Sequence, residues 1–371
     1  MAAMFAKGTG RISGAPRSIL LIQLGDIGDV ILSLPCLRAL REHFPRARVV
    51  VAVRDKAAAL FEECPWVDDV IAVGTPPHGA FAGLRHQVAF LHRLRALRCD
   101  LAMDLRTGTR GAIMAWLSGA PQRIGFHARG ETFWRNRLFT DLYRPEREAK
   151  VHMTDYLQNL LLACGIPVRH PVPMLSVATT RQEEARQLLV ATGVAPGSAV
   201  VAVQPFSLWR YKELAQSKVA GVIRLIRQRY DLPVVVTGSA GERERVAALV
   251  KESGPGVYSL AGKTTLGQLA AVLQCCTLFI GMDSAGLHLA AAVGTPTVAV
   301  FGPSSPDSWA PRGENHRVVQ KDFPCVPCHE KGCGGNGQSR CLDALTTEEI
   351  GAAVMRQLDG VAGCRLAAGG C

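Results

Sequence analysis

The sequence predicts an α/β protein with two doubly wound domains, each built on a parallel sheet. The 371 residues are long for one domain and suit two. Short aliphatic runs alternate with helical patterns along most of the chain, which is typical of βαβ units. Within residues 277–303, an apolar strand is followed by a loop, a helix and a second strand, so the two strands must be parallel.

The composition favours a protein with an anionic partner. Lys and Arg number 42 against 31 Asp and Glu, which gives a formal net charge of +11. Such an excess suggests a phosphorylated substrate, an acidic membrane surface or nucleic acid. Nucleic acid is the weaker choice, because only 6% of the residues are aromatic and no RNA- or DNA-binding signature occurs.

No apolar run approaches the roughly 18 residues that are needed to span a bilayer. Residues 1–17 are Gly-rich and basic and lack the apolar core of a secretory signal. We therefore expect residues 1–17 to form a flexible tail and the protein to reside in the cytoplasm.

The first half opens with a strand, a turn and a helix. The continuous aliphatic run Ser18–Gln23 predicts a buried strand, and Gly25 and Gly28 then lead the chain into a helix. This is not the dinucleotide fingerprint, because the third glycine is missing. Asp29 lies at or near the helix N-terminus, where the helix dipole favours a carboxylate, and Asp26 is a second carboxylate in the same turn. A helix cap is the alternative to a functional role.

The same alternation continues through the first half, with strands predicted over 48–53, 69–73 and 100–105 and helices over 56–64, 90–97 and 152–164. Arg106, Arg110 and Arg123 follow on consecutive loops beside a strand end and indicate an anion site, although a single surface arginine is usually only solvated. We expect residues 127–147 to form a mobile basic loop. The proline-containing segment 165–173 is the predicted domain linker.

The second half begins with a helix predicted over 180–192 and a strand over 199–204. Ser207 and Lys212 follow this strand, and a lysine after such a turn can act as a point charge on a phosphate. An ordinary lysine at a helix start is the alternative. Glu242 follows a further strand over 232–237, where negative charge at a helix N-terminus is the simple explanation.

The segment that follows is the most regular strand–helix–strand unit. A short strand over 277–280 leads into the loop Met282–Gly286, a helix over 287–293 and a buried strand over 297–301. An open α/β sheet binds ligands at the carboxyl ends of its strands, and the N–H groups of a helix N-terminus favour an anion. Asp283 or Ser284 is also a natural N-cap, so helix capping alone is the alternative.

Four cysteines stand close together in a Gly-rich segment, residues 325–341, with the spacing C-x2-C-x4-C-x7-C: Cys325, Cys328, Cys333 and Cys341. Twelve cysteines in a chain without a secretory signal argue for free thiols. Four thiols this close can hold a zinc ion or an iron–sulfur cluster, while reduced, metal-free thiols are the alternative. No general base accompanies them, so we expect a structural role. A terminal helix is predicted over 346–358.

Several of these motifs resemble glycosyltransferase family 9, the ADP-heptose heptosyltransferases that build the inner core of bacterial lipopolysaccharide. The longest matching run is DSAGLHLAAAVGTPTVAVFGP, residues 283–303, which departs from the family pattern at Ala285, where glycine is usual. The segments GDIGDV, DLRTGTR, RIGF and PFSLWRYKE also match, with Leu214 in the place of a usual tryptophan. The resemblance covers most of the chain.

This resemblance implies the GT-B arrangement, in which two Rossmann-like domains face each other across a cleft. It implies an acceptor-binding domain over 18–172, a nucleotide-sugar-binding domain over 173–345, and a terminal helix and tail over 346–371. The implied reaction is inverting transfer of a heptose from ADP-heptose to the phosphorylated lipid A-core acceptor. Catalysis of this kind requires no metal or cofactor.

The resemblance also implies roles for individual residues. Asp29 matches the proposed general base, and Arg106, Arg110 and Arg123 lie on the face that takes the acceptor. Ser207 and Lys212 match positions at the donor phosphates. The rest of the implied donor site consists of Glu242 at the nucleoside and the loop and helix residues Asp283, Ser284, Ala285, Gly286 and His288.

The WRYKE segment and the cysteines resemble the heptosyltransferase III branch, and the expected location is peripheral to the cytoplasmic face of the inner membrane. Two alternatives remain open. The chain could use another nucleotide sugar, or it could be a non-catalytic scaffold that binds nucleotide sugars. The retained Asp29, Lys212, Asp283 and His288 argue against a decayed site.

Overall fold

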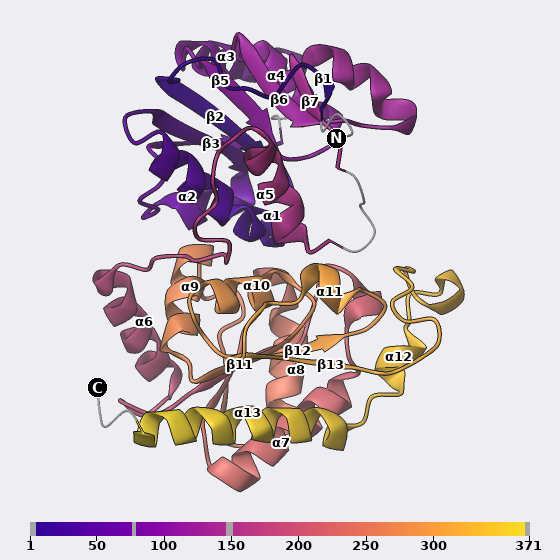
Figure 1. Ribbon diagram of the computed structural model, residues 1–371. Coiled ribbons are helices and arrows are strands. Elements are labelled where there is room, and N and C mark those ends of the chain that lie inside the picture. The colour runs from indigo at the N-terminus through magenta and orange to yellow at the C-terminus, as the bar shows by residue number, and fades with distance from the viewer. Residues whose placement is uncertain (1–4, 76–78, 146–150, 368–371) are drawn as a thin grey trace. The chain divides into compact units, whose positions relative to one another are not determined.

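The computed structural model describes residues 5–75, 79–145 and 151–367 (Figure 1). The chain divides into two compact units, Met1–Pro173 and Met174–Cys371. The division falls at the end of the predicted linker 165–173. No helix of the described residues is long and apolar enough to cross a membrane.

The first unit contains a seven-stranded sheet in the order β1-β7-β6-β5-β2-β3-β4, parallel except for the edge strand β1. Its strands are β1 Phe5–Lys7, β2 Ser18–Gln23, β3 Arg48–Arg54, β4 Asp69–Val73, β5 Leu101–Asp104, β6 Gln122–Phe126 and β7 Asp141–Tyr143. Its helices are α1 Ile27–Leu32, α2 Leu34–His43, α3 Ala80–Ala96, α4 Thr109–Leu117 and α5 Met153–Ala163, with 3₁₀ segments η1 Asp55–Phe61 and η2 Gly130–Leu138.

The second unit contains a six-stranded, wholly parallel sheet in the order β10-β9-β8-β11-β12-β13. Its strands are β8 Val201–Gln204, β9 Val234–Val236, β10 Val257–Ser259, β11 Leu278–Met282, β12 Thr297–Phe301 and β13 His316–Gln320. Its helices are α6 Thr179–Thr192, α7 Gln216–Tyr230, α8 Arg243–Ser253, α9 Leu266–Cys275, α10 Ala285–Ala292, α11 Pro306–Trp309, α12 Arg340–Asp343 and α13 Thr347–Ala367, with 3₁₀ segments η3 Arg210–Lys212, η4 Ala240–Glu242 and η5 Cys333–Gly335. The long α13 packs beside α7 (Figure 1).

Both sheets reverse their strand order at one place. In the first unit the chain moves outward from β2 to β4 and then returns to the other side of β2 with β5. In the second unit it does the same with β8, β9 and β10, and returns with β11. This is the doubly wound Rossmann order, in which ligands bind at the carboxyl ends of the two strands that flank the reversal. The functional side chains should therefore follow β2, β5, β8 and β11.

Burial explains which strands the sequence reveals. Every residue of β2, β5, β11 and β12 is buried, as expected for inner strands of a parallel sheet with helices on both faces. Such strands appear as unbroken aliphatic runs, and the predicted bounds of β2, β4 and β12 coincide with the structure. The strands β6, β10 and β13 were not predicted, because they are short or carry polar residues.

The amino-terminal segment differs from the predicted flexible tail. Within its described part, β1 pairs antiparallel with β7, with Phe5 opposite Tyr143. The chain then turns over Asp141, whose Oδ1 accepts hydrogen bonds from the N–H groups of Thr9 (3.0 Å) and Gly10 (2.8 Å). The prediction failed because the partner strand lies far away in the sequence.

The mobile loop predicted over 127–147 is also wrong for its described part, residues 127–145. This stretch forms η2 and β7, and Arg135 within η2 is completely buried. Its guanidinium contacts Asp104 at 2.9 Å and donates to the carbonyl oxygens of Gly108 (3.1 Å), Phe126 (2.8 Å) and Arg106 (3.1 Å). A segment whose sequence is polar is thus ordered by one buried cation.

The environment of Asp104 makes this ion pair important for folding. Burial raises the pKa of Asp104 to about 7, although Arg135 acts in the opposite direction. Asp104 also accepts a hydrogen bond from the N–H of Arg106 through Oδ1 (3.1 Å). Gly111 must lack a side chain, because a Cβ there would lie 2.6 Å from Asp104 Oδ1.

We expect Arg135→Met to destabilise the first unit by about 3–5 kcal/mol, because it leaves the Asp104 carboxylate buried without its cation. Arg137→Met, which alters an exposed arginine of the same segment, is the matched control. Thermal and denaturant unfolding measure the difference. The deficit should shrink as the pH falls, since a buried carboxyl is tolerated in its protonated form. Equal stability of the two variants would contradict this role of Arg135.

Candidate functional site

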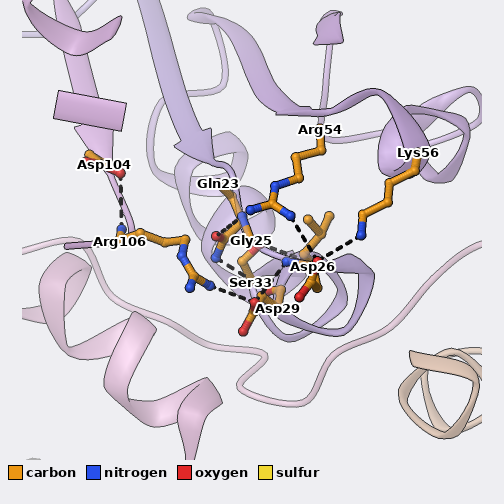
Figure 2. Close-up of polar contacts among 10 residues, drawn as sticks. Gln23, Gly25, Asp26, Asp29, Ser33, Arg54, Lys56, Asp104 and Arg106 are labelled. Carbon is orange, nitrogen blue, oxygen red and sulfur yellow. Dashed lines mark hydrogen bonds and ion pairs between the residues drawn. The ribbon is translucent and has the colours of Figure 1, made fainter. Parts of the chain in front are cut away.

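The loop after β2 presents the predicted base, Asp29, at the start of α1. Asp26 is the N-cap of this helix, and Asp29 Oδ2 accepts a hydrogen bond from the Asp26 N–H at 3.0 Å. The same oxygen lies 2.6 Å from Arg106 Nη1 (Figure 2). Arg106 comes from the loop after β5, so this ion pair joins the two strands at the reversal of the first sheet. Asp29 thus takes part in the helix cap, and its carboxylate also forms an ion pair with Arg106.

Asp26, the second carboxylate of this turn, is engaged elsewhere. Its Oδ1 lies 2.8 Å from Lys56 Nζ and 3.1 Å from Arg54 Nη1 (Figure 2). The hydrogen bond from Lys56 lowers the pKa of Asp26, with further help from the charges of Lys56, Arg54 and Arg106. The Asp29 side chain is 16% exposed and that of Asp26 is 47% exposed. The two aspartates therefore have different environments in one turn.

Gly25 allows the charged groups to meet at this turn. A Cβ at Gly25 would lie 2.5 Å from Asp29 Oδ2 and 2.6 Å from Arg106 Nη1, which is closer than real contacts allow. The Gly25 N–H donates to Gln23 Oε1 at 3.2 Å, which fixes the backbone where the strand ends. The missing side chain at Gly25 therefore leaves room for Asp29 and Arg106 to approach each other.

The buried pair Asp104–Arg135 holds Arg106 in place. Asp104 binds the N–H of Arg106 and Arg135 binds its carbonyl oxygen, so both backbone groups of this residue are fixed. Neither Asp104 nor Arg135 was among the predicted site residues. An aspartate that ends an otherwise aliphatic strand, as in LAMD, is the signal that could have identified Asp104.

The predicted cluster of three arginines does not form. Arg106 reaches Asp29, whereas Arg110 on α4 donates to the carbonyl oxygen of Gly74 at 2.9 Å. Arg123 is the second residue of β6, so it lies near the amino end of its strand, away from the carboxyl ends that bear Arg106. Its guanidinium donates to the carbonyl oxygens of Leu138 (2.7 Å) and Ala120 (2.6 Å). Spacing in the sequence did not reveal which edge of the sheet each arginine occupies.

In the second unit, charged groups again meet at the reversal of the sheet. Lys212 Nζ, from the segment after β8, lies 2.6 Å from Asp283 Oδ2, directly after β11. The Lys212 side chain is 21% exposed and that of Asp283 is 7% exposed. Ser207 Oγ donates to the carbonyl oxygen of Asp283 at 3.5 Å. The structure thus brings together Ser207, Lys212 and Asp283, which stand far apart in the sequence.

The helix α10 begins beside this ion pair. Ser284 is its N-cap residue but makes no side-chain capping bond, so the N–H groups of Ala285 and Gly286 remain for an anion. Gln204 Nε2 donates instead to Ser284 Oγ at 3.4 Å. A Cβ at Gly286 would lie 1.9 Å from Gln204 Oε1, so a side chain here would displace the Gln204 amide from Ser284. His288 is buried within α10.

Glu242, predicted at the nucleoside, closes a helix cap in the structure. Its Oε2 accepts hydrogen bonds from the N–H (2.6 Å) and Oγ (2.8 Å) of Ser239. Both residues follow β9, so Glu242 lies at the carboxyl edge of the sheet, one strand away from the Lys212–Asp283 pair. Helix capping, the simpler of the two explanations for Glu242, therefore accounts for its contacts with Ser239.

Two further residues support the Lys212 loop and were not predicted. Glu213 accepts a hydrogen bond from the Ser207 N–H at 3.1 Å and lies 2.5 Å from Arg245 Nη2. The Arg245 guanidinium also lies 3.7 Å from the centre of the Phe206 ring. These contacts close the loop from Phe206 to Glu213 around Lys212.

The cysteine segment packs against the same loop. Ser339 Oγ donates to the Tyr211 carbonyl oxygen at 2.7 Å, and Lys331 Nζ lies 5.9 Å from the centre of the Trp209 ring. Within residues 5–75, 79–145 and 151–367, no group of three or more His, Cys, Asp or Glu side chains is positioned to hold a metal ion. Cys341 is buried, Cys328 and Cys333 are half-buried, and Cys325 is exposed. Burial raises the pKa of the Cys341 thiol, and Cys333 and Cys328 act in the same direction.

Two doubly wound, Rossmann-like units form the architecture of the GT-B class of glycosyltransferases, although other proteins share such units. The sequence model described as glycosyltransferase family 9 (heptosyltransferase) matches residues 87–337, and this match identifies the class. The chain belongs to glycosyltransferase family 9.

Individual relatives extend this likeness over most of the chain. Lipopolysaccharide heptosyltransferase 2 of Escherichia coli K12 is 30% identical over 90% of this chain and 96% of the relative. Lipopolysaccharide heptosyltransferase 3 of the same strain is 27% identical over 78% and 83%, respectively. The solved structure of E. coli ADP-heptose lipopolysaccharide heptosyltransferase II has a TM-score of 0.73 at 22% identity and covers 92% of this chain and 98% of that one. The chain thus resembles both heptosyltransferase 2 and heptosyltransferase 3.

Proposed function

We propose that this glycosyltransferase moves a heptose from ADP-heptose to the inner core of lipopolysaccharide, with inversion at the anomeric carbon. The observation that carries the proposal is the carboxylate of Asp29 at the sheet reversal of one unit, matched by the Lys212 and α10 anion site at the reversal of the other. The names of the relatives support the choice of ADP-heptose and lipopolysaccharide.

In the proposed reaction, a hydroxyl oxygen of the acceptor attacks the anomeric carbon of the donor. A new C–O bond forms, the bond from that carbon to the diphosphate oxygen breaks, and ADP leaves with the electron pair. Asp29 takes the proton of the attacking hydroxyl. Both described contacts of the Asp29 carboxylate fall on Oδ2, so Oδ1 is the atom assigned to the proton. Arg106 orients the carboxylate.

The diphosphate of the donor occupies the start of α10. The N–H groups of Ala285 and Gly286 donate to its oxygens, and the positive end of the helix dipole favours the charge that develops as ADP leaves. Lys212 carries three N–H donors, of which one meets Asp283, so the others serve the phosphates. Ser207 is held beside them by Glu213. Glu242 lies one strand away, on the nucleoside side.

The acceptor belongs to the first unit in this proposal. Arg106 lies beside the base and meets a phosphate of the acceptor core, and Arg110 follows on α4. Arg123 is assigned to holding η2 and β6 together, because its donors already bind carbonyl oxygens. The enzyme acts at the cytoplasmic face of the inner membrane, where a lipid-linked acceptor is present.

Two other functions predict different ligand binding. A transferase for another nucleotide sugar would be stabilised by UDP or GDP rather than by ADP. A scaffold with a decayed site would respond to none of them, and a scaffold that still binds nucleotide sugars would respond without transferring the sugar. Thermal shifts with the three nucleotides identify the donor, and turnover with a core acceptor separates the enzyme from a binding scaffold. Selective stabilisation by ADP supports the proposed donor.

We expect Asp29→Asn to lower kcat by about a hundredfold or more while leaving ADP affinity unchanged, because the amide cannot accept the hydroxyl proton. Asp26→Asn is the matched control from the same turn and should lower kcat far less, since Asp26 pairs with Lys56 and Arg54. Steady-state kinetics with ADP-heptose and a core acceptor provide the measurement. Native-like turnover of the Asp29→Asn enzyme would remove Asp29 from the mechanism.

We expect Lys212→Ala to weaken ADP binding by about tenfold or more, measured by calorimetry, because a charge-assisted contact to phosphate is lost. High salt should weaken native binding in the same direction. Lys251→Ala, at an exposed lysine of α8, is the control. The double variant Lys212→Ala/Asp283→Asn separates loss of the cation from the effect of an unpaired carboxylate. If the double variant binds ADP as tightly as the native enzyme, Lys212 has no role at the phosphates.

The proposal includes a structural metal ion on the cysteine segment. Cys333 and Cys328 each raise the pKa of the Cys341 thiol beyond the effect of burial, and the Arg340 N–H donates to Cys333 Sγ at 3.4 Å. Thiolates of this kind suit Zn²⁺ or iron. No three of these side chains are positioned to hold an ion within the described residues, so metal binding requires the segment to close around it, the exposed Cys325 included. The ion would support the segment that contacts Trp209 and Tyr211.

Elemental analysis of protein purified without a His-tag should give about one zinc or iron per chain. Cys328→Ser should lose the metal and make residues 320–345 sensitive to protease, because the segment has little apolar core. Cys275→Ser, which changes a half-buried thiol elsewhere in the second unit, should keep the metal. Substoichiometric metal together with four titratable thiols in the native segment would exclude the metal site.

A further inference from the structure

The helices α3 and α4 of the first unit carry a patch of exposed apolar side chains, and they lie against each other (Figure 1). Leu84, Val88 and Leu91 on α3 are 63%, 46% and 36% exposed, and Ile113 and Trp116 on α4 are 40% and 51% exposed. Their spacing of three and four residues places them along one side of each helix. Among the described side chains of α3, Leu94 alone is fully buried. A folded domain rarely leaves such a surface to water without a partner.

The patch is hollowed between the two helices. A cavity of about 310 Å³ opens there, with Val88 and Leu91 on one wall, Ile113 and Leu117 on the other, and Gly74 at the end of β4. Arg110 lies at this end, where it donates to the Gly74 carbonyl oxygen. The walls are largely apolar, so the hollow accepts a hydrocarbon chain better than a polar ligand.

The segments that carry α3 and α4 contain charges of one sign, while Asp69 and Asp55 approach from neighbouring segments, at Arg93 and Gly74. Residues 70–99, which include all of α3, contain no aspartate or glutamate, and neither do residues 105–130, which include α4. Exposed arginines accompany the apolar side chains, among them Arg85 and Arg95 of α3. Arg95 donates to the carbonyl oxygen of Leu117, whereas Arg93 lies on another side of α3, donates to the carbonyl oxygen of Val70 and pairs with Asp69 at 3.5 Å. An apolar strip bordered by cations and containing a tryptophan has the character of a surface that lies in a membrane interface.

We propose that the α3–α4 patch, defined by Leu84, Val88, Leu91, Ile113 and Trp116, docks the enzyme on an anionic lipid bilayer. The apolar side chains enter the headgroup region, acyl chains reach the hollow between the helices, and the arginines meet lipid phosphates. The other site of the first unit, Asp29 and Arg106, follows the strands β2 and β5 of the same sheet. This inference deepens the proposed function, since a docked first unit would meet a lipid-linked acceptor at the surface where that acceptor resides.

Cosedimentation of the full chain with vesicles tests the proposal without donor or acceptor, so its outcome is independent of the transferase reaction. Native protein should bind vesicles of phosphatidylethanolamine with phosphatidylglycerol, bind phosphatidylcholine vesicles more weakly, and dissociate at high salt. Leu84→Ser/Val88→Ser should weaken vesicle binding by about tenfold or more, because the bilayer then buries two fewer apolar side chains. Leu162→Ser/Val190→Ser is the matched control, at positions that are 50% and 44% exposed on α5 and α6.

Circular dichroism and ADP affinity establish that both double variants are folded. Arg85→Gln should weaken binding to the anionic vesicles only. The proposal is overturned if native protein ignores both kinds of vesicle, or if the two double variants bind equally well. It is also overturned if the native chain forms a dimer that Leu84→Ser/Val88→Ser dissociates while vesicle binding is unchanged, because the patch would then join two copies.

Discussion

The buried ion pair between Asp104 and Arg135 is the interaction on which the first unit depends. It lies where β5 ends, and its donors and acceptors fix the backbone of Arg106, the carbonyl of Gly108 and the end of β6. Two charges this deeply buried are costly unless every polar group around them is satisfied. Here the Arg135 guanidinium binds Asp104 and three carbonyl oxygens, so the polar segment η2 is ordered. These contacts position Arg106 beside Asp29.

The two units each have an ion pair at the place where the strand order of the sheet reverses. Each sheet reverses between two parallel strands, and each reversal is bridged by a carboxylate at or just before a helix start and a cation from the neighbouring loop. In the first unit the carboxylate follows β2 and the cation follows β5, whereas in the second unit the cation follows β8 and the carboxylate follows β11. A glycine sits beside both carboxylates, since a Cβ at Gly25 or Gly286 would collide with the side chains that line the site. The strand order of each sheet therefore decides which charged side chains meet at the site where a ligand would bind.

The cysteine segment and the donor loop are also coupled. Ser339 contacts Tyr211 within the 3₁₀ turn Arg210–Lys212, and Lys331 contacts Trp209, the residue that precedes this turn. Order in the cysteine segment is therefore transmitted to the proposed phosphate site through direct contacts. Conversely, α3 and α4 have few such partners on their outer sides, and their exposed apolar residues point to a role outside the domain.

The sequence by itself determined the α/β class, the fully buried strands β2, β5, β11 and β12, and the loops after β2, β8 and β11, because buried parallel strands form aliphatic runs that end where polar, glycine or proline residues begin. It also placed Asp29, Lys212 and Asp283 at those turns. Only the tertiary structure decided which charges meet, since Asp29 and Arg106 are far apart along the chain and become neighbours through strand order. The same order separated Arg123 from Arg106, paired Phe5 with Tyr143 and buried Arg135. Local pattern carries no information on such contacts, because they depend on which edge of the sheet each residue reaches.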